Sequence, residues 1–176
     1  MNYHAYLFVD GSSSRSDDIG AWAAVACCGE QRQLLYGIDF PTTISRCELR
    51  PVIEGLRWIK ANWGSGPGFK VCVYSDSEYT VKTLSGVYEK GAKNKELWVA
   101  VAEASAGMSV TYRWRERNSL PYMSLCDGIC GNLRQVQIEF MAKVARNPRK
   151  PEADMPFFTL DELEVADGYT RPEIKV

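Results

Sequence analysis

The order of apolar segments in this 176-residue sequence predicts an α/β domain. Three observations lead to this fold class. Two apolar segments separated only by Gly29-Glu30 predict a β-hairpin, because glycine readily adopts the backbone conformations of two-residue turns. Several later segments repeat their apolar residues at helical spacing, and two short segments rich in β-branched and aromatic residues lie between them. The element order β-β-β-α-β-α-α-β-α therefore predicts a five-stranded mixed sheet, three antiparallel strands followed by two parallel ones, flanked by helices.

The first three strands form the antiparallel part of the predicted sheet. Tyr6–Asp10 is an apolar run that ends in an acidic residue and stops before Gly11 and three serines, so we expect a strand followed by a turn. The predicted hairpin consists of Gly20–Cys28 and Gln31–Phe40.

The remaining elements alternate between helices and strands. Thr42 or Thr43 can cap a helix whose apolar residues recur from Leu49 to Ile59. Pro51 lies inside this helix and is expected to kink it or delay its start, because proline lacks the N–H of the helical hydrogen bond. The elements that follow are a strand at 69–74, helices at 77–84 and 97–106, a strand at 109–115 and a last helix at 123–146.

Four acidic residues lie far apart in the sequence, each in its own short motif: Asp10, Glu48, Asp76 and Asp127. The right-handed crossover through the first helix makes the first and fourth strands parallel neighbours, which brings Asp10 beside Asp76. Glu48 then reaches in from the crossover helix, and Asp127 from the start of the last helix. Four carboxylates brought together repel one another, and hard divalent cations bound by oxygen ligands are the usual remedy. The pattern predicts a two-metal site for phosphoryl transfer.

Each acidic residue also has a purely structural interpretation. Asp10 could initiate a turn, Glu48 could complement a helix dipole, and Asp76 and Asp127 could cap helices. Taken singly, each of these interpretations is as good as the metal-binding one. The hypothesis of a metal site depends on all four occurring together.

The motifs in their order resemble those of the type 1 ribonuclease H family from about Tyr6 to Arg134. The matching pieces are D-G-S after the first strand, T-T-x-x-R-x-E-L at a helix start, D-S-x-Y at a strand end, Leu97-Trp98 in a helix, a W-x-W-like strand with Tyr112 and Trp114, and a late C-D on the last helix. The fold implied is the ribonuclease H-like fold.

The resemblance implies a divalent-metal-dependent endonuclease that cleaves the RNA strand of RNA/DNA hybrids with two Mg²⁺ or Mn²⁺ ions. It implies catalytic and metal-binding roles for the four carboxylates: Asp10 would bridge both ions, Glu48 and Asp76 would hold one, and Asp127 the other. The residues expected to contact substrate are Ser12, Ser13, Arg15, Ser45, Arg46 and Asn118.

The sequence departs from the family in the substrate-binding segments. The family histidine before the last helix is replaced by Asn118, which cannot exchange a proton near neutral pH; Arg115, Glu116 or Arg117 could partly substitute for it. Asparagines expected in the helix-start motif are Ile44 and Ser45 here. Two alternative functions therefore stay open: a catalytically weak or silent nucleic-acid-binding or partner-docking module, and a nuclease acting on another nucleic-acid structure.

Composition places further bounds on the chain. The stretch 148–176 carries a net charge of −3 and several prolines, so we expect a domain at 1–147 and an acidic C-terminal extension whose segment Phe157–Leu163 packs on the domain or on a protein partner. The net charge of 1–147 is +2, which indicates modest, salt-sensitive binding to nucleic acid.

The six cysteines lie in apolar segments with no C-x-x-C, so we expect buried, reduced thiols rather than a zinc site. Without a membrane-length apolar run or a signal peptide, we expect a cytoplasmic monomer.

Overall fold

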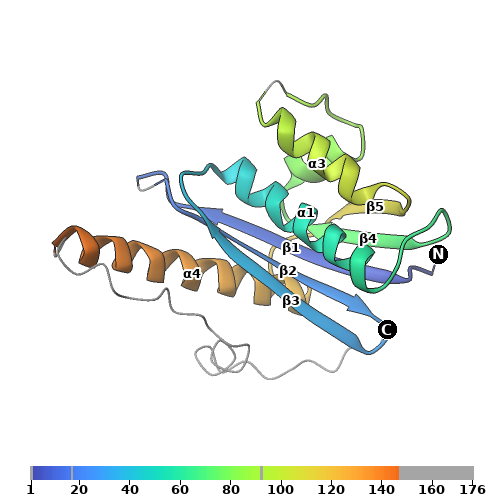
Figure 1. Cartoon of the computed structure of the whole chain (residues 1–176), viewed down its shortest axis with the longest axis horizontal. Helices are drawn as coiled ribbons and strands as arrows, with labels where there is room; N and C mark the ends of the chain where they lie inside the picture. The colour runs from blue at the N-terminus through green and yellow to red at the C-terminus, as the bar shows by residue number, and fades with distance from the viewer. Residues whose placement is uncertain (1, 17, 92, 147–176) are drawn as a thin grey trace.

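The structure is a computed structural model that describes residues 2–16, 18–91 and 93–146 (Figure 1). The predicted extension at 148–176, and with it the prediction for Phe157–Leu163, lies outside the described residues. The elements are β1 (Ala5–Ser13), β2 (Gly20–Cys28), β3 (Gln31–Asp39), α1 (Ile44–Asn62), β4 (Lys70–Ser75), α2 (Glu78–Leu84), α3 (Lys95–Ser105), β5 (Ser109–Trp114) and α4 (Pro121–Arg146).

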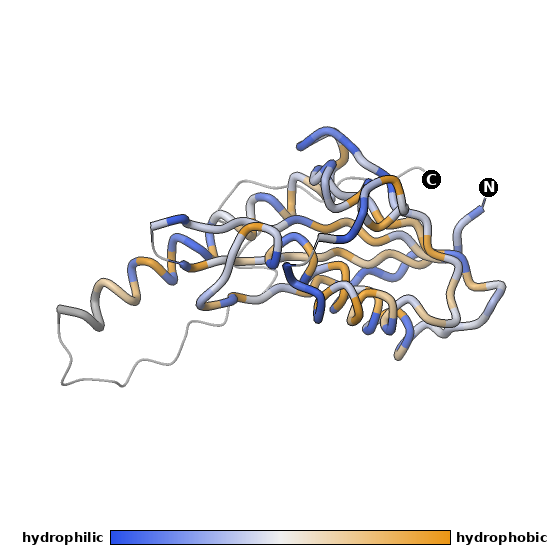
Figure 2. The backbone as a smooth tube through the Cα atoms, turned by 90° about the horizontal axis from the view of Figure 1, so that it is seen from above, coloured by the Kyte–Doolittle hydropathy of each residue, from blue (hydrophilic) through white to orange (hydrophobic). Residues whose placement is uncertain are grey.

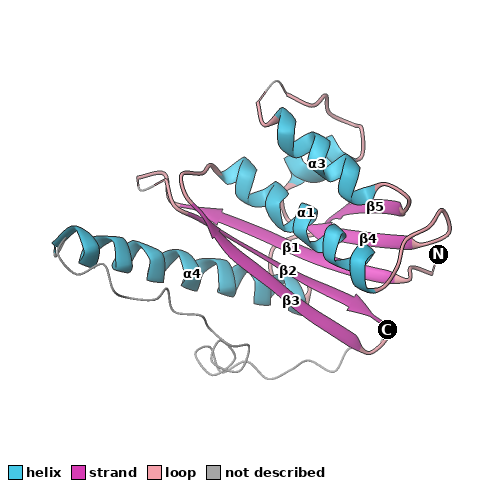
Figure 3. Ribbon diagram, in the orientation of Figure 1, coloured by secondary structure: helices cyan, strands magenta, loops and turns pink. Residues whose placement is uncertain are grey.

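The strands form one five-stranded sheet in the order β3-β2-β1-β4-β5 (Figure 3). The β1–β2 and β2–β3 pairs are antiparallel, whereas β1–β4 and β4–β5 are parallel. The hairpin turns at Gly29, whose φ of 55° lies in the left-handed region that suits glycine. The predicted α/β fold class, with three antiparallel strands and then two parallel ones, is confirmed.

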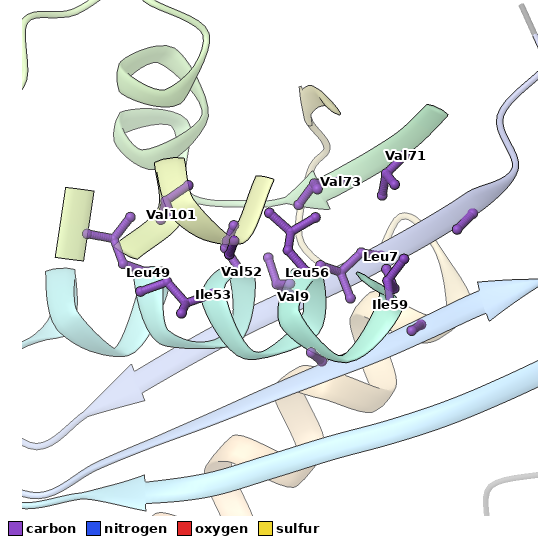
Figure 4. Packing of buried hydrophobic residues seen from close by; sticks show 14 of the residues in the cluster. Leu7, Val9, Leu49, Val52, Ile53, Leu56, Ile59, Val71, Val73 and Val101 are labelled. Carbon is purple, nitrogen blue, oxygen red and sulfur yellow. The ribbon is translucent and has the colours of Figure 1, made fainter. Parts of the chain in front are cut away.

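Helices cover both faces of the sheet, and alternate residues of each strand point to opposite helices. On one face, α1 and α3 bury the apolar side chains of β1 and β4; Figure 4 shows this packing between Leu7, Val9, Val71 and Val73 and the α1 residues Leu49, Val52, Ile53, Leu56 and Ile59. On the other face, α4 packs on β2 through a second cluster. Figure 2 shows the same arrangement as hydrophobic residues concentrated along the strands.

One local prediction was wrong, and another was wrong in one of its two alternatives. The strand β1 does not turn at Gly11 but continues to Ser13, because Gly11 and the serines pair with the first residues of β2. Pro51 does not delay α1, which begins at Ile44 directly after its N-cap Thr43. The proline is itself one of the buried residues of the helix.

None of the described helices is long and apolar enough to cross a membrane.

Candidate active site

Asp10 and Asp76 come together because the two central strands separate just before them. The last parallel pair between β1 and β4 is Phe8 with Tyr74, and each aspartate lies two residues beyond its member of that pair. Asp10 remains inside the sheet, paired with Ala23 of β2, and is only 3% exposed. Asp76 lies immediately after the end of β4, so the two carboxyl groups lie at the same edge of the parallel pair.

Glu48 reaches the same place because α1 crosses directly over β1 at a glycine. A Cβ atom on Gly11 would lie 2.4 Å from the Cys47 carbonyl and 2.6 Å from the Glu48 nitrogen, distances at which no side chain fits. The missing side chain therefore lets the first turns of α1 rest on the strand. Glu48 is brought to the carboxyl group of Asp10 and is itself only 7% exposed.

Asp10, Glu48 and Asp76 form one cluster, in which an oxygen of each lies within 4.8 Å of the others. Within the described part of the chain, the Asp10 Oδ2 and Glu48 Oε2 atoms are buried and have no hydrogen-bond partner. Buried carboxylate oxygens without donors are costly, and a bound cation would remove that cost. The residues present thus fit a divalent metal ion held by oxygen ligands.

Burial and mutual repulsion both raise the proton affinity of this carboxylate cluster. Burial, followed by repulsion from Asp76 and then Asp127, raises the pKa of Asp10 from its ordinary 3.8 to about 7. Burial also raises the pKa of Glu48 well above its ordinary value, and the nearby Asp10 and Asp76 add to this. The site therefore resists holding several negative charges until positive charge is added.

The structural alternatives for the four acidic residues do not fit the observed local structure. Asp10 initiates no turn, since β1 continues past it. Glu48 is not in the first turn of α1, which contains no acidic residue. Ser77, not Asp76, is the N-cap of α2. Asp127 cannot cap α4, because that helix already begins at Pro121.

The structure brings together three of the four predicted carboxylates, and Asp127 lies outside the cluster of three. Asp127 is linked to it through Arg117, whose Nη1 lies 3.4 Å from Asp127 Oδ1. The Nε of the same guanidinium donates a hydrogen bond to Asp76 Oδ2 at 2.7 Å. The carboxylates therefore have a protein cation beside them, which the sequence analysis did not predict.

Arg117 takes this position because of the loop between β5 and α4. A hydrogen bond from the Ser119 N–H to the Glu116 carbonyl closes a turn, and Asn118 occupies a left-handed conformation with φ of 61°. Asparagine tolerates this conformation better than most residues. Asn118, predicted to contact substrate, thus shapes the turn that presents Arg117. Sequence spacing gave no signal for the position of Arg117, because that position depends on the backbone conformation of one residue, Asn118.

The other predicted substrate-contacting residues lie on segments next to the cluster. Ser12 and Ser13 end β1, and Arg15 follows them. Ser45 lies in the first turn of α1, and the neighbouring Arg46 is engaged by Glu96 of α3 at 2.6 Å.

Arg134 was not predicted as a functional residue, although it lies next to this edge of the sheet. Its Nη1 donates to the Ser12 hydroxyl at 2.5 Å and to the Ser13 carbonyl at 3.4 Å. A spacing of seven residues from Asp127, two helical turns on one face of α4, was the signal that could have found it.

The cysteines behave as small buried residues. All six are free, five are buried, and the Cys130 thiol donates to the Asp10 carbonyl at 3.4 Å. The single histidine, His4, accepts a hydrogen bond from the Lys70 N–H and stacks on Phe69, away from the cluster. The prediction of buried thiols is confirmed for five of the six cysteines, and Cys28 is half-buried.

Comparisons with known proteins bear on the family and the fold of the chain. The sequence model of the RNase H family matches residues 2–116. A ribonuclease H from Cupriavidus metallidurans is 32% identical over 136 residues, which cover 70% of this chain and 90% of that protein. A ribonuclease H from Sulfurovum sp. is 34% identical over 134 residues, covering 72% and 87%.

Solved structures share the fold at low sequence identity. The N-terminal RNase H domain of Rv2228c from Mycobacterium tuberculosis, solved as a fusion with maltose-binding protein, superposes with a TM-score of 0.68 at 18% identity and covers 80% of this chain and 99% of that one. LC11-RNase H1, solved in complex with an RNA/DNA hybrid, gives 0.62 at 17% identity and covers 76% and 99%.

Proposed function

Because the chain belongs to the RNase H family, we propose that it is a divalent-metal-dependent endonuclease that hydrolyses the RNA strand of RNA/DNA hybrids. The observation that carries the proposal is the meeting of three carboxylates from β1, α1 and the end of β4, with buried oxygens that lack donors. A scaffold without chemistry gains nothing from such a cluster, because like charges at this distance oppose folding.

Asp10, Glu48 and Asp76 would hold the metal, with Asp127 as a further ligand. Divalent ions bound there supply Lewis-acid activation of the attacking water and stabilisation of the leaving 3′ oxygen. The protein contributes the fixed position of the ligands: Asp10 is held within the sheet and Glu48 by the contact of α1 with β1. Asp127, on the more exposed α4, has more freedom to move toward an ion.

Hydroxyls and guanidinium groups beside the cluster would bind the nucleic acid. Ser12 and Ser13 end the strand that carries Asp10, and Arg134 holds the Ser12 hydroxyl in place. Serine hydroxyls can bond ribose 2′-hydroxyls, which distinguish RNA from DNA, and arginines such as Arg15 and Arg134 suit phosphate oxygens. These contacts would orient the RNA strand over the carboxylates.

One observation favours a catalytically silent nucleic-acid-binding module as the second candidate. Arg117 already pairs with Asp76 and Asp127, so two of the four carboxylates have a cationic partner without a metal ion. The absence of the family histidine points the same way, since Asn118 cannot transfer a proton.

Strand-specific cleavage tests the proposal. The full chain is incubated with Mg²⁺ or Mn²⁺ and an end-labelled RNA/DNA hybrid, double-stranded RNA or branched DNA, with Asp10→Asn as the blank. Cleavage of the RNA strand of the hybrid alone, lost in the blank, is the expected result. Cleavage of another substrate would change the assigned specificity, and binding without any cleavage would favour the silent module.

A further inference from the structure

The guanidinium of Arg117 is the cationic group next to the carboxylates. It contacts Asp76 at 2.7 Å and Asp127 at 3.4 Å, and among the described residues no other ion pair reaches the four predicted ligands. Its charge also opposes the rise in the pKa of Asp10 and of Glu48. Arg117 therefore offsets part of the negative charge of the site when no metal ion is bound.

The position of Arg117 suits a group that can leave the carboxylates. Its side chain is 57% exposed, whereas that of Asp76 is only 9% exposed. The residue sits on a turn outside β5 and α4, so its side chain can swing without moving either element. Its planar guanidinium presents paired N–H donors that match phosphate oxygens as well as carboxylates.

A metal ion and Arg117 compete for the same carboxylate group, that of Asp76. The Asp76 Oδ2 atom that accepts from Arg117 belongs to one of the three carboxylates that lie within 4.8 Å of one another. An ion held by this cluster would also repel the guanidinium at short range. Metal binding therefore favours the release of Arg117 toward solvent, where the phosphates of a bound nucleic acid would lie.

We propose that Arg117 is an internal counter-ion that exchanges partners during substrate binding. In the metal-free protein it holds Asp76 and Asp127; when divalent cations occupy the carboxylates, it moves to a phosphate oxygen of the nucleic acid. This inference rests on the proposed function, and it assigns Arg117 a phosphate-binding role. It involves no proton transfer, because an arginine stays protonated throughout the working pH range.

Metal affinity tests the first half of the exchange. Thermal melting of the full chain is followed while MnCl₂ or MgCl₂ alone is added, with Arg117→Gln compared to wild type. Breaking an ion pair of this kind is worth about fivefold in an equilibrium constant, so the variant should half-saturate at about one-fifth of the metal concentration. Arg57→Gln is the matched control, since Arg57 is similarly exposed and pairs with Glu54 on α1, and it should leave the value unchanged.

Affinity for a hybrid tests the second half. Binding of an RNA/DNA hybrid at saturating Mg²⁺ is measured by rapid mixing, before cleavage, in protein that keeps all four carboxylates. Adding Arg117→Gln should weaken binding about fivefold and lower the salt dependence by about one phosphate contact. Arg117→Lys keeps the charge but not the paired donors, so its hybrid affinity should lie between those of the protein with Arg117 and of Arg117→Gln. Arg57→Gln should not change the hybrid affinity.

The possible failures can be told apart. If the wild type is stabilised by metal but Arg117→Gln half-saturates at the same or a higher concentration, the counter-ion role is wrong and the proposed function stands. If metal affinity rises but hybrid affinity is unchanged, the transfer to phosphate is wrong. If the wild type is not stabilised by either metal, the metal site itself fails, and the inference fails with it.

Discussion

Replacing Asp10 by asparagine should stabilise the metal-free protein, and the gain should grow with pH. Asp10 is buried in the sheet, and its pKa is raised from 3.8 to about 7. A carboxyl group with a raised pKa binds its proton more tightly in the folded state than in the unfolded state. The folded protein therefore loses stability as pH rises from about 4 to about 7, and the loss is complete above that window.

The size of the effect follows from the shift in the Asp10 pKa. Each pKa unit corresponds to about 1.4 kcal/mol, so ionisation of Asp10 costs the folded state at most about 4 kcal/mol at pH 8 and about 1.6 kcal/mol at pH 5. Asparagine has nearly the same shape and does not ionise. The variant's advantage over wild type should therefore be about 2–3 kcal/mol larger at pH 8 than at pH 5, or roughly 5–10 °C in melting temperature.

Urea unfolding in EDTA at the two pH values measures this difference. Glu103→Gln, which removes an exposed carboxyl group on α3, is the control and should show the pH dependence of wild type. Saturating Mg²⁺ should stabilise the wild type more than the Asp10→Asn variant. If wild type and variant kept the same difference in unfolding free energy at pH 5 and pH 8, the argument that burial and repulsion destabilise the ionised site would be wrong.

Three other substitutions test separate parts of the structure. Gly11→Ala would place a Cβ atom 2.4 Å from the α1 backbone. The variant should lose about 3 kcal/mol of unfolding free energy, and it should also lose the stabilisation by metal ions. Gly66→Ala is the control and should cost little, because the space around Gly66 is open. Arg134→Gln should weaken hybrid binding in a filter assay while leaving the melting temperature nearly unchanged. A clear fall in the melting temperature beside the weaker binding would make the residue structural. If the extension packs on the domain, the double substitution Phe157→Ser and Phe158→Ser should lower the melting temperature, because one buried ring contributes about 2 kcal/mol to the unfolding free energy. An unchanged melting temperature would favour a protein partner instead.

The fold could be predicted because its strands and helices carry clear periodic patterns. Turn chemistry located the hairpin at Gly29, and the crossover rule then placed β4 beside β1, which is enough to bring Asp10 and Asp76 together. Boundaries were harder where two local signals competed. Gly11 and the following serines favour a turn, but the paired edge of β2 was available and extended the strand.

The electrostatics of the site depended on details that no spacing reveals. Arg117 reaches the carboxylates because Asn118 adopts a left-handed conformation, and a single backbone angle of that kind leaves no periodic signal. Arg134 meets Ser12 only because α4 lies along the end of β1. Such contacts are set by how elements pack, so sequence analysis found the carboxylates of the candidate site but not the arginine that pairs with two of them.

The most direct test of the account is a metal titration of the full chain followed by thermal melting, with wild type beside Asp76→Asn and the exposed control Glu103→Gln. If the three carboxylates bind a metal ion, Mg²⁺ or Mn²⁺ should stabilise wild type and the control by about 2.7 kcal/mol at a concentration one hundred times Kd, and Asp76→Asn should respond much less. If all three proteins responded alike, or none responded, the cluster of Asp10, Glu48 and Asp76 would not be a metal site.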